Sequence, residues 1–391
     1  MNFLEKETEN NFKVAKVSLI SFSHLIHDIY TSFLSPLLPI IINKFSLNYS
    51  FAGFLILLIR IPALFSPIMT SYSKIINPYT ILILTPLISS ICMSFLLNIS
   101  SIWIIVILLI LTGISSAYYH IPSPIIIKHY SGNRTGTGMS FYMFGGELAR
   151  SLGPLIILTA ISWWGENNAY YVVSLGILAS IILFIQISMD GDFKRNNHID
   201  NTKIKDVILR QKKVLLIASS LVLTKTFMVI AMTSFLPVFL THKGESLWFA
   251  GISLSLIEIF GAIGSMIAGS LSDLIGRRKM LIIISIISPI FMLLFIFARG
   301  IIIYPLLIIL GLLVFSFSPI ILAYVIENEK DSPTIANSIL MAINFGIGSF
   351  VALIFGFFSD LLSLQISYIL SAIISFIGIP FILKMPIHNK E

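Results

Sequence analysis

The chain has 391 residues, of which 57% are hydrophobic and only 11% are charged. Soluble domains carry roughly a quarter charged residues, so this composition excludes an ordinary water-soluble globular protein. The net charge of +7 would suggest nucleic-acid binding in a soluble protein, but here it is better explained by basic residues placed on one side of a membrane. The single cysteine, Cys92, excludes a disulfide framework and a thiol-based metal cluster.

Apolar segments, mostly of about 20 residues or more, follow one another along the chain, and such a segment can cross a bilayer as a helix. Helices are expected because lipid offers no hydrogen-bond partners to the backbone. The predicted spans are 15–42, 50–73, 78–97, 102–127, 137–161, 168–189, 213–240, 247–271, 279–298, 301–326, 334–358 and 363–384. The sequence therefore predicts an all-α membrane protein with twelve transmembrane helices.

One long polar stretch interrupts the apolar pattern between spans six and seven. It runs from Asp190 to Lys213 and is rich in charged residues and asparagine. It divides the chain into an N-terminal six-helix bundle at 1–189, a cytoplasmic linker at 190–212 and a C-terminal six-helix bundle at 213–391. This layout is typical of a secondary transporter.

The basic residues predict the orientation of the chain. If the N-terminus is cytoplasmic, most of the 25 lysines and arginines fall in cytoplasmic segments, and the outer loops hold only Lys44, Lys243 and Arg299. A change of one in the number of spans would remove this asymmetry. We therefore expect both termini in the cytoplasm.

A motif of the form G-x-x-x-D-x-x-G-R-[KR]-[KR] lies between spans eight and nine. Its positions are occupied by Gly269, Asp273, Gly276, Arg277, Arg278 and Lys279. We expect Gly269 to permit close helix approach, Asp273 to lie near a helix start and the basic run to stay in the cytoplasm. The motif resembles the signature loop of the major facilitator superfamily. That resemblance implies two six-helix bundles around a central cavity, and a gating role for this loop.

Three stretches of the N-terminal half are similar to the fosmidomycin resistance family within that superfamily. They are His24–Asp28 with Pro36 and Pro39, Ser115–His120, and Ser131–Gly132 leading to Ser140–Glu147 and Leu152–Leu155. Members of that family use the proton gradient to export a small drug through the bacterial inner membrane. The resemblance implies a proton-coupled antiporter, with a helix-packing motif at Gly145, Gly146, Gly153 and Pro154.

The sequence departs from this family in three places. His120-Ile-Pro lacks the acidic residue of the family's His-Pro-Glu, and Ala149 replaces a glycine. The first signature loop, Thr70–Lys74, lacks both its glycine and its aspartate. The substrate therefore does not carry over from the family, and the direction of transport carries over only weakly.

Ionisable groups inside a bilayer are costly, so their positions indicate function. Spans three, six, nine and twelve have no charged residue in their interiors, and the resemblance implies that these four spans face lipid. The candidates for proton coupling are Asp28, Glu147, His24, His27 and His120. The candidates for substrate binding are Arg60, Arg150, Lys225, Glu258 and Asn344, of which the cations would suit an anionic, phosphonate-like solute.

Structural roles are open for several of these residues. Glu147 and Arg150 are one turn apart and suit an ion pair, His24 suits a packed imidazole bonded to a backbone carbonyl, and Lys225 is a possible counter-ion for Glu258.

A proton-coupled importer of an organic anion or metal chelate is the alternative transport function, and a membrane-embedded enzyme or receptor is a second class. No nucleophile motif or metal-hydrolase spacing indicates an enzyme. We expect a monomer in the bacterial inner membrane that acts on a small solute and protons, with no cofactor, metal site or nucleic acid.

Overall fold

The computed structural model describes residues 12–66, 69, 77–188, 204–329 and 331–385. Within these ranges the chain forms helices and no strands. Eleven of the helical segments are long and apolar enough to cross a membrane, and Tyr49–Phe65 is a shorter apolar helix. The predicted all-α fold is confirmed, with the shorter helix at the position of span two.

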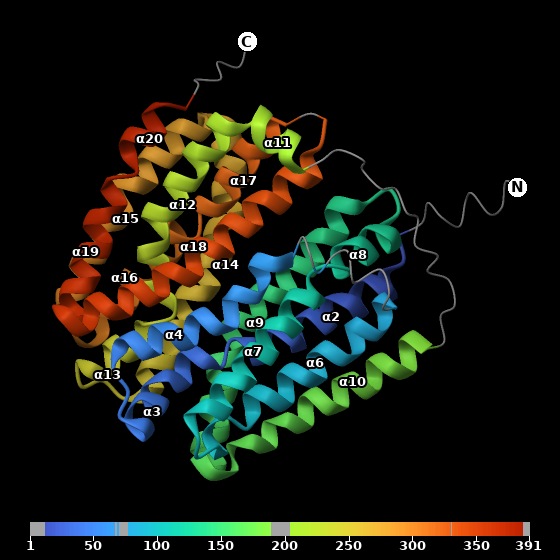
Figure 1. Cartoon of the computed structure of the whole chain (residues 1–391), viewed down its shortest axis with the longest axis vertical. Coiled ribbons are helices and arrows are strands. Elements are labelled where there is room, and N and C mark those ends of the chain that lie inside the picture. The colour runs from blue at the N-terminus through green and yellow to red at the C-terminus, as the bar shows by residue number, and fades with distance from the viewer. Residues whose placement is uncertain (1–11, 67–68, 70–76, 189–203, 330, 386–391) are drawn as a thin grey trace, which may run out of the picture. The chain divides into compact units, whose positions relative to one another are not determined.

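The chain divides into two compact units (Figure 1). Unit 1 comprises residues 1–34 and 65–194, and unit 2 comprises 35–64 and 195–391. The segment at 35–64, which precedes the linker in sequence, is thus part of the same compact unit as the residues that follow the linker.

The helices of unit 1 are α2 (Val14–Thr31), α6 (Pro78–Ser94), η2 (Leu96–Asn98), α7 (Ile102–Tyr119), α8 (Ser123–Ser131), α9 (Thr135–Trp164), η3 (Glu166–Val172) and α10 (Val173–Ser188). The helix α2 packs along α9 on one side and against α6 on another. A buried apolar cluster that includes Ile20, Leu82, Ile126 and Leu183 joins these helices.

Unit 2 begins with α3 (Leu34–Phe45), α4 (Tyr49–Arg60) and η1 (Ile61–Phe65). It continues after the linker with α11 (Ile204–Arg210), α12 (Lys212–Thr233), α13 (Leu236–His242), α14 (Leu247–Ile275), α15 (Arg277–Phe297), η4 (Gly300–Ile302), α16 (Ile303–Val314), α17 (Phe317–Glu327), α18 (Pro333–Leu361), α19 (Leu364–Phe376) and α20 (Ile379–Leu383). Within this unit α18 packs along α4 and α12, and α14 packs along α16.

Five spans are broken into two α-helices, and each break lies just before a proline. Proline has no amide hydrogen and its ring clashes with the carbonyl four residues earlier, so the helix stops there. Pro36 follows the break between α2 and α3, Pro124 that between α7 and α8, Pro237 that between α12 and α13, Pro319 that between α16 and α17, and Pro380 that between α19 and α20. These breaks divide spans one, four, seven, ten and twelve.

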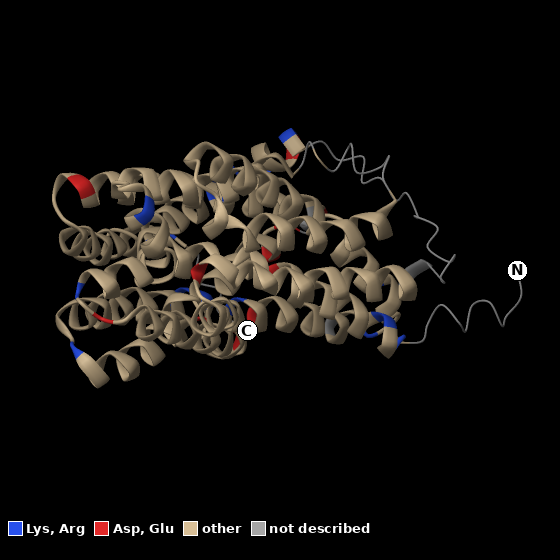
Figure 2. Ribbon diagram, turned by 90° about the horizontal axis from the view of Figure 1, so that it is seen from below, with Lys and Arg blue, Asp and Glu red and all other residues tan. Residues whose placement is uncertain are grey.

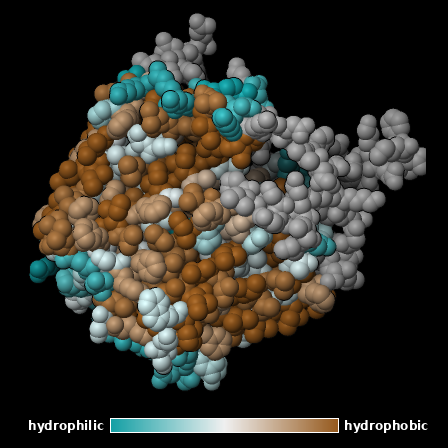
Figure 3. All heavy atoms as spheres, in the orientation of Figure 1, coloured by the Kyte–Doolittle hydropathy of each residue, from teal (hydrophilic) through white to brown (hydrophobic). Residues whose placement is uncertain are grey.

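The charged residues are sparse along the helices, whereas apolar side chains cover much of the visible surface (Figures 2 and 3). On α10 the side chains of Leu178 and Phe184 are more than half exposed, and on α15 so are Leu294 and Phe297. Large exposed apolar surfaces are unfavourable in water and favourable against lipid. These surfaces therefore fit helices that face the bilayer.

In span two, α4 and η1 extend to Phe65, and Ser66 and Met69 are also helical. Most of the remainder of the predicted span, which continued to residue 73, lies outside the described residues. The degenerate first signature loop at Thr70–Lys74 lies outside the described residues.

Candidate functional site

The buried polar centre of unit 1 starts on α2. His24 and Asp28 are one turn apart and share a face of this helix. Their side chains are almost fully buried, and His24 Nε2 lies 3.2 Å from Asp28 Oδ2. A second imidazole therefore needs only to reach the other carboxylate oxygen to complete a three-residue group.

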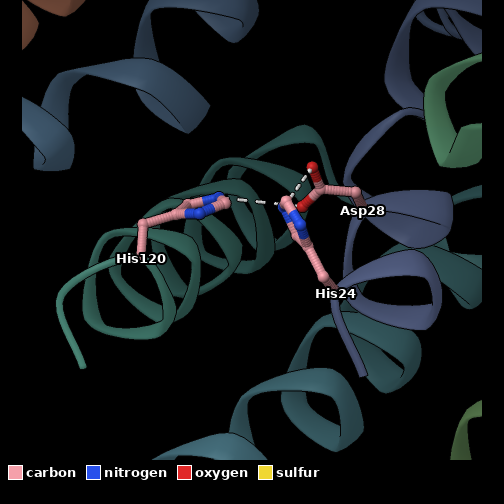
Figure 4. Close-up of side chains that lie close together, drawn as sticks. All are labelled: His24, Asp28 and His120. Carbon is pink, nitrogen blue, oxygen red and sulfur yellow. Dashed lines mark ion pairs between the residues drawn. The ribbon is translucent and has the colours of Figure 1, made fainter. Parts of the chain in front are cut away.

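His120 supplies that second imidazole because span four breaks beside it. It is the C-cap residue of α7, four residues before Pro124, so its side chain leaves the helix end rather than a regular turn. His120 Nε2 lies 3.7 Å from Asp28 Oδ1. Figure 4 shows the rings of His24 and His120 directed toward the Asp28 carboxylate. We call these three residues the His–Asp–His group.

Tyr142 on α9 holds both rings of this group, and the sequence analysis did not select it. Its backbone carbonyl lies 2.8 Å from His24 Nδ1, and its hydroxyl lies 3.2 Å from His120 Nδ1. Its ring also stacks on His24 with centroids 4.0 Å apart. A tyrosine in an apolar span carries no pattern that distinguishes this role from ordinary packing.

The predicted packing motif brings α9 close enough to α2 for these contacts. A Cβ atom on Gly145 would lie 2.5 Å from the carbonyl oxygen of Ser21, and one on Gly146 would lie 2.5 Å from His24 Cε1. Gly153 lies similarly against Ser32 and the carbonyl of Ile29. Pro154 lies within α9 without ending the helix.

His27 is buried on a different side of α2. Its ring stacks on Tyr119 with centroids 4.5 Å apart, and its Nδ1 lies 3.4 Å from Ser89 Oγ. It is therefore not part of the His–Asp–His group, although the sequence analysis grouped it with the same proton-coupling candidates.

Glu147 and Arg150 form an ion pair one turn apart on α9, as their spacing suggested. The Arg150 side chain is 40% exposed and that of Glu147 is 20% exposed. Neither partner of this pair is fully buried.

Lys225 on α12 is the buried cation of unit 2. Its Nζ donates to Ser375 Oγ at 2.6 Å and lies 3.5 Å from Ser288 Oγ, and it also lies over the ring of Phe317. The possible ion pair with Glu258, a buried residue of α14, is not found among the described residues. Neutral hydroxyls thus surround the ammonium group.

A small, partly open pocket lies beside Lys225 within unit 2. Thr226, Ser318 and Asn344 give it polar lining groups, and Phe317 and Val314 give it apolar ones. Two of the predicted substrate-binding candidates, Lys225 and Asn344, thus line the same pocket. Arg60, on α4, does not line this pocket, and its Nη2 lies 3.4 Å from Ser234 Oγ.

The signature loop joins three helices of unit 2 through Arg277. The guanidinium lies 2.5 Å from an oxygen of Asp273 on α14 and 2.7 Å from one of Glu327 on α17. Gly276 has a φ of 96°, which allows the sharp turn from α14 into α15. Arg278 donates to the carbonyl of Met385 at 3.3 Å.

Two expectations for this loop are wrong. Nothing in the described part of the chain lies within 4 Å of a Cβ placed on Gly269, so this glycine does not serve close helix approach there. Asp273 lies in the last turn of α14 rather than near a helix start. Its carboxylate pairs with Arg277 instead of interacting with the positive end of a helix dipole.

The family model of the Major Facilitator Superfamily matches residues 20–352. The chain belongs to the major facilitator superfamily. It is therefore a multi-pass membrane transporter and not an enzyme, and its helices have the major facilitator fold.

Curated relatives of this facilitator span almost the whole chain. It is 26% identical over 368 residues to the fosmidomycin resistance protein of Escherichia coli (strain K12), which covers 92% of this chain and 90% of that protein. It is 21% identical to the uncharacterized transporter YfnC of Bacillus subtilis (strain 168), with the same two coverages. The predicted resemblance to the fosmidomycin resistance family is confirmed.

Solved transporters share the fold at low sequence identity. A bacterial homologue of the human lysosomal transporter Spinster matches with a TM-score of 0.80 and 15% identity, covering 95% of this chain and 96% of that one. A D-xylose-proton symporter matches with a TM-score of 0.75 and 16% identity, covering 96% and 98%.

Proposed function

We propose that this facilitator exports a small anionic solute in exchange for protons. The observation that carries the proposal is Lys225, a buried cation that borders a pocket and has only hydroxyls and an aromatic ring as described partners. A charged side chain at the centre of a transmembrane helix costs roughly 3 kcal/mol. An anionic solute in the pocket would offset this cost.

The remaining lining of the pocket suits such a solute. The amide of Asn344 and the hydroxyls of Thr226 and Ser318 can donate hydrogen bonds to carboxylate, phosphate or phosphonate oxygens. Val314 and Phe317 can pack against its apolar part. Similarity to the fosmidomycin resistance protein favours export and makes fosmidomycin the first solute to test.

The proposed coupling element is the Glu147–Arg150 pair. A deprotonated Glu147 neutralises Arg150, whereas a protonated Glu147 releases the guanidinium for a solute anion or another partner. Because both side chains are partly exposed, protons can reach the pair from water.

Drug accumulation in cells tests the anion and direction parts of the proposal. Cells that express the wild-type chain should accumulate less fosmidomycin than cells without it, and a protonophore should abolish the difference. Higher accumulation in expressing cells would instead identify an importer, the alternative function.

Substitutions on α12 isolate the role of Lys225. Lys225→Gln should lower proton-driven efflux at least about tenfold, equivalent to about 1.4 kcal/mol, and Lys225→Arg should retain part of it. Lys213→Gln removes an exposed lysine from the same helix and is the matched control. Full efflux by Lys225→Gln at normal expression would refute the anion site.

Substitution of Glu147 tests the coupling element separately. In proteoliposomes, Glu147→Gln should abolish uphill transport driven by a pH gradient but retain exchange of solute for solute. If Glu147→Gln still concentrates solute against its gradient as well as the wild type does, protons are coupled elsewhere.

A further inference from the structure

We propose that the His–Asp–His group of unit 1 binds a divalent first-row transition-metal ion. The group offers three ligand atoms, His24 Nε2, His120 Nε2 and one carboxylate oxygen of Asp28, that lie within 4.8 Å of one another. Nitrogen ligands from imidazole together with one carboxylate suit zinc, iron, cobalt or nickel, whereas magnesium and calcium prefer ligand sets made of oxygen.

The spacing of the ligand atoms fits such an ion. Metal–nitrogen and metal–oxygen bonds of roughly 2.0–2.2 Å, at tetrahedral or octahedral angles, put neighbouring ligand atoms roughly 2.8–3.6 Å apart. The distance from His24 Nε2 to Asp28 Oδ2 is 3.2 Å, and that from His120 Nε2 to Asp28 Oδ1 is 3.7 Å. A movement of His120 toward the other two ligand atoms would bring all three onto one ion.

One hydrogen bond of His24 fixes the tautomer of its neutral ring. A backbone carbonyl can only accept, so the contact with the carbonyl of Tyr142 requires a proton on His24 Nδ1. In a neutral imidazole Nε2 then carries a lone pair, and this buried atom makes no hydrogen bond within the described residues. It lies 3.2 Å from a carboxylate oxygen, so two electron-rich atoms face each other.

A chain of hydroxyls gives His120 the same tautomer. Ser123 has one proton and donates it to the carbonyl of Tyr119 at 2.6 Å. The Tyr142 hydroxyl must then donate to Ser123, 2.9 Å away, and accept from His120 Nδ1. In the neutral ring, His120 Nε2 thus also carries a lone pair, which is directed at the Asp28 carboxylate.

With both rings neutral, Nε2 of His24, Nε2 of His120 and the Asp28 carboxylate face one another without a positive charge, and a metal ion would supply one. Imidazole ligands of metals are commonly held in this way, with the outer N–H bonded to a carbonyl or hydroxyl. Three protein ligands leave coordination positions open for water or for an oxygen of a small solute. The assignment does not depend on anion export, because it concerns other residues.

Metal binding can be measured directly on the purified full-length protein in detergent, after removal of any polyhistidine tag and dialysis against a chelator. Co²⁺ titration should produce visible absorption bands with a stoichiometry of one ion per chain, and Zn²⁺ should displace the Co²⁺. This result needs no variant, so it does not depend on whether a variant folds. Absence of saturable Co²⁺ and Zn²⁺ binding would overturn the proposal, and the short contacts would then belong to a protonated imidazole.

Variants locate the site. Asp28→Asn and His120→Gln should each weaken Zn²⁺ binding at least about tenfold, and Tyr142→Phe should weaken it less because only the support of His120 is lost. His129→Gln removes an exposed imidazole on α8 and should bind like the wild type. Equal affinity in Asp28→Asn and the wild type would place the ion elsewhere. Fosmidomycin efflux measured with a chelator present tests the proposed export function without bound metal, and so separately from metal binding.

Discussion

At the scale of single residues, glycines decide how closely α2 and α9 approach. Gly145 faces the backbone of α2, and Gly146 faces the ring of His24. Side chains at these two positions would push the helices apart or displace an imidazole. The packing of unit 1 and the geometry of its buried polar centre therefore depend on the same two positions.

Alanine at Gly145 should therefore destabilise the protein. Its Cβ would lie 2.5 Å from the carbonyl oxygen of Ser21, a backbone atom that cannot move alone. Overpacking of this kind costs about 1–3 kcal/mol, so Gly145→Ala should lower the thermal unfolding midpoint in detergent by several degrees.

Gly269→Ala is the matched control, because open space surrounds this position and alanine favours a helix by up to about 1 kcal/mol. Its unfolding midpoint should stay the same or rise. Equal midpoints for both variants would show that the packing of α2 on α9 is looser than these distances indicate.

The sequence predicted the members of the His–Asp–His group but not their assembly. The four-residue spacing put His24 and Asp28 on one face of α2. His120 joins them because Pro124 ends α7 there, a tertiary consequence that residue spacing alone does not express. Tyr142 was missed because its two roles use a backbone carbonyl and a hydroxyl, neither of which leaves a sequence pattern.

At the scale of helices, α4 and α18 form the closest pairing in unit 2. A Cβ on Gly53 would lie 2.3 Å from the carbonyl oxygen of Ala352, and one on Gly356 would lie 2.1 Å from that of Tyr49. At the end of this interface Asp360 accepts from the backbone amides of Tyr49 and Ser50, each at 2.7 Å. A carboxylate of α18 thus satisfies free amides in the first turn of α4.

Removal of this carboxylate should loosen the start of α4. Asp360→Ala leaves two amides and the hydroxyl of Ser50 without this acceptor, and loss of a helix cap costs about 1–2 kcal/mol. Faster hydrogen exchange at residues 49–52 by mass spectrometry would report it. Asp206→Ala, an exposed change on α11, is the control, and unchanged exchange in Asp360→Ala would contradict the capping role.

Helix positions were predictable from apolar segment length, because a bilayer demands about 20 residues from each span. The positions of the helix breaks were harder to predict from the sequence. Pro39, Pro86, Pro154 and Pro289 lie inside continuous helices, whereas Pro36, Pro124, Pro237, Pro319 and Pro380 follow breaks. Neighbouring helices decide which prolines a span tolerates, and the local sequence does not contain that information.

At the scale of the whole molecule, the distribution of lysine and arginine predicts which loops face the cytoplasm. This orientation stays a prediction, since the helices themselves carry no record of the side on which they were inserted. A single native cysteine, Cys92, buried on α6, makes the orientation simple to measure.

Cysteine labelling in intact cells should distinguish the two sides. In a Cys92→Ser background, Glu166→Cys should react with a membrane-impermeant maleimide added outside, because we expect the loop between spans five and six to lie there. Asp206→Cys should react only after the cells are broken. Both positions are exposed, so accessibility within the fold does not confound the comparison. The reverse pattern would invert the predicted topology.

Four of the five proline breaks bear on how the chain arose. These four lie in the first span of each successive group of three, at spans one, four, seven and ten, whereas the fifth divides span twelve. Three-span units nested within each half are the expected result of repeated gene duplication in this class of transporter. A three-span ancestor would have needed this proline at only one position. The four copies of that unit have since acquired different charged residues. The break in one copy now contributes His120, and the break in another lies beside Lys225.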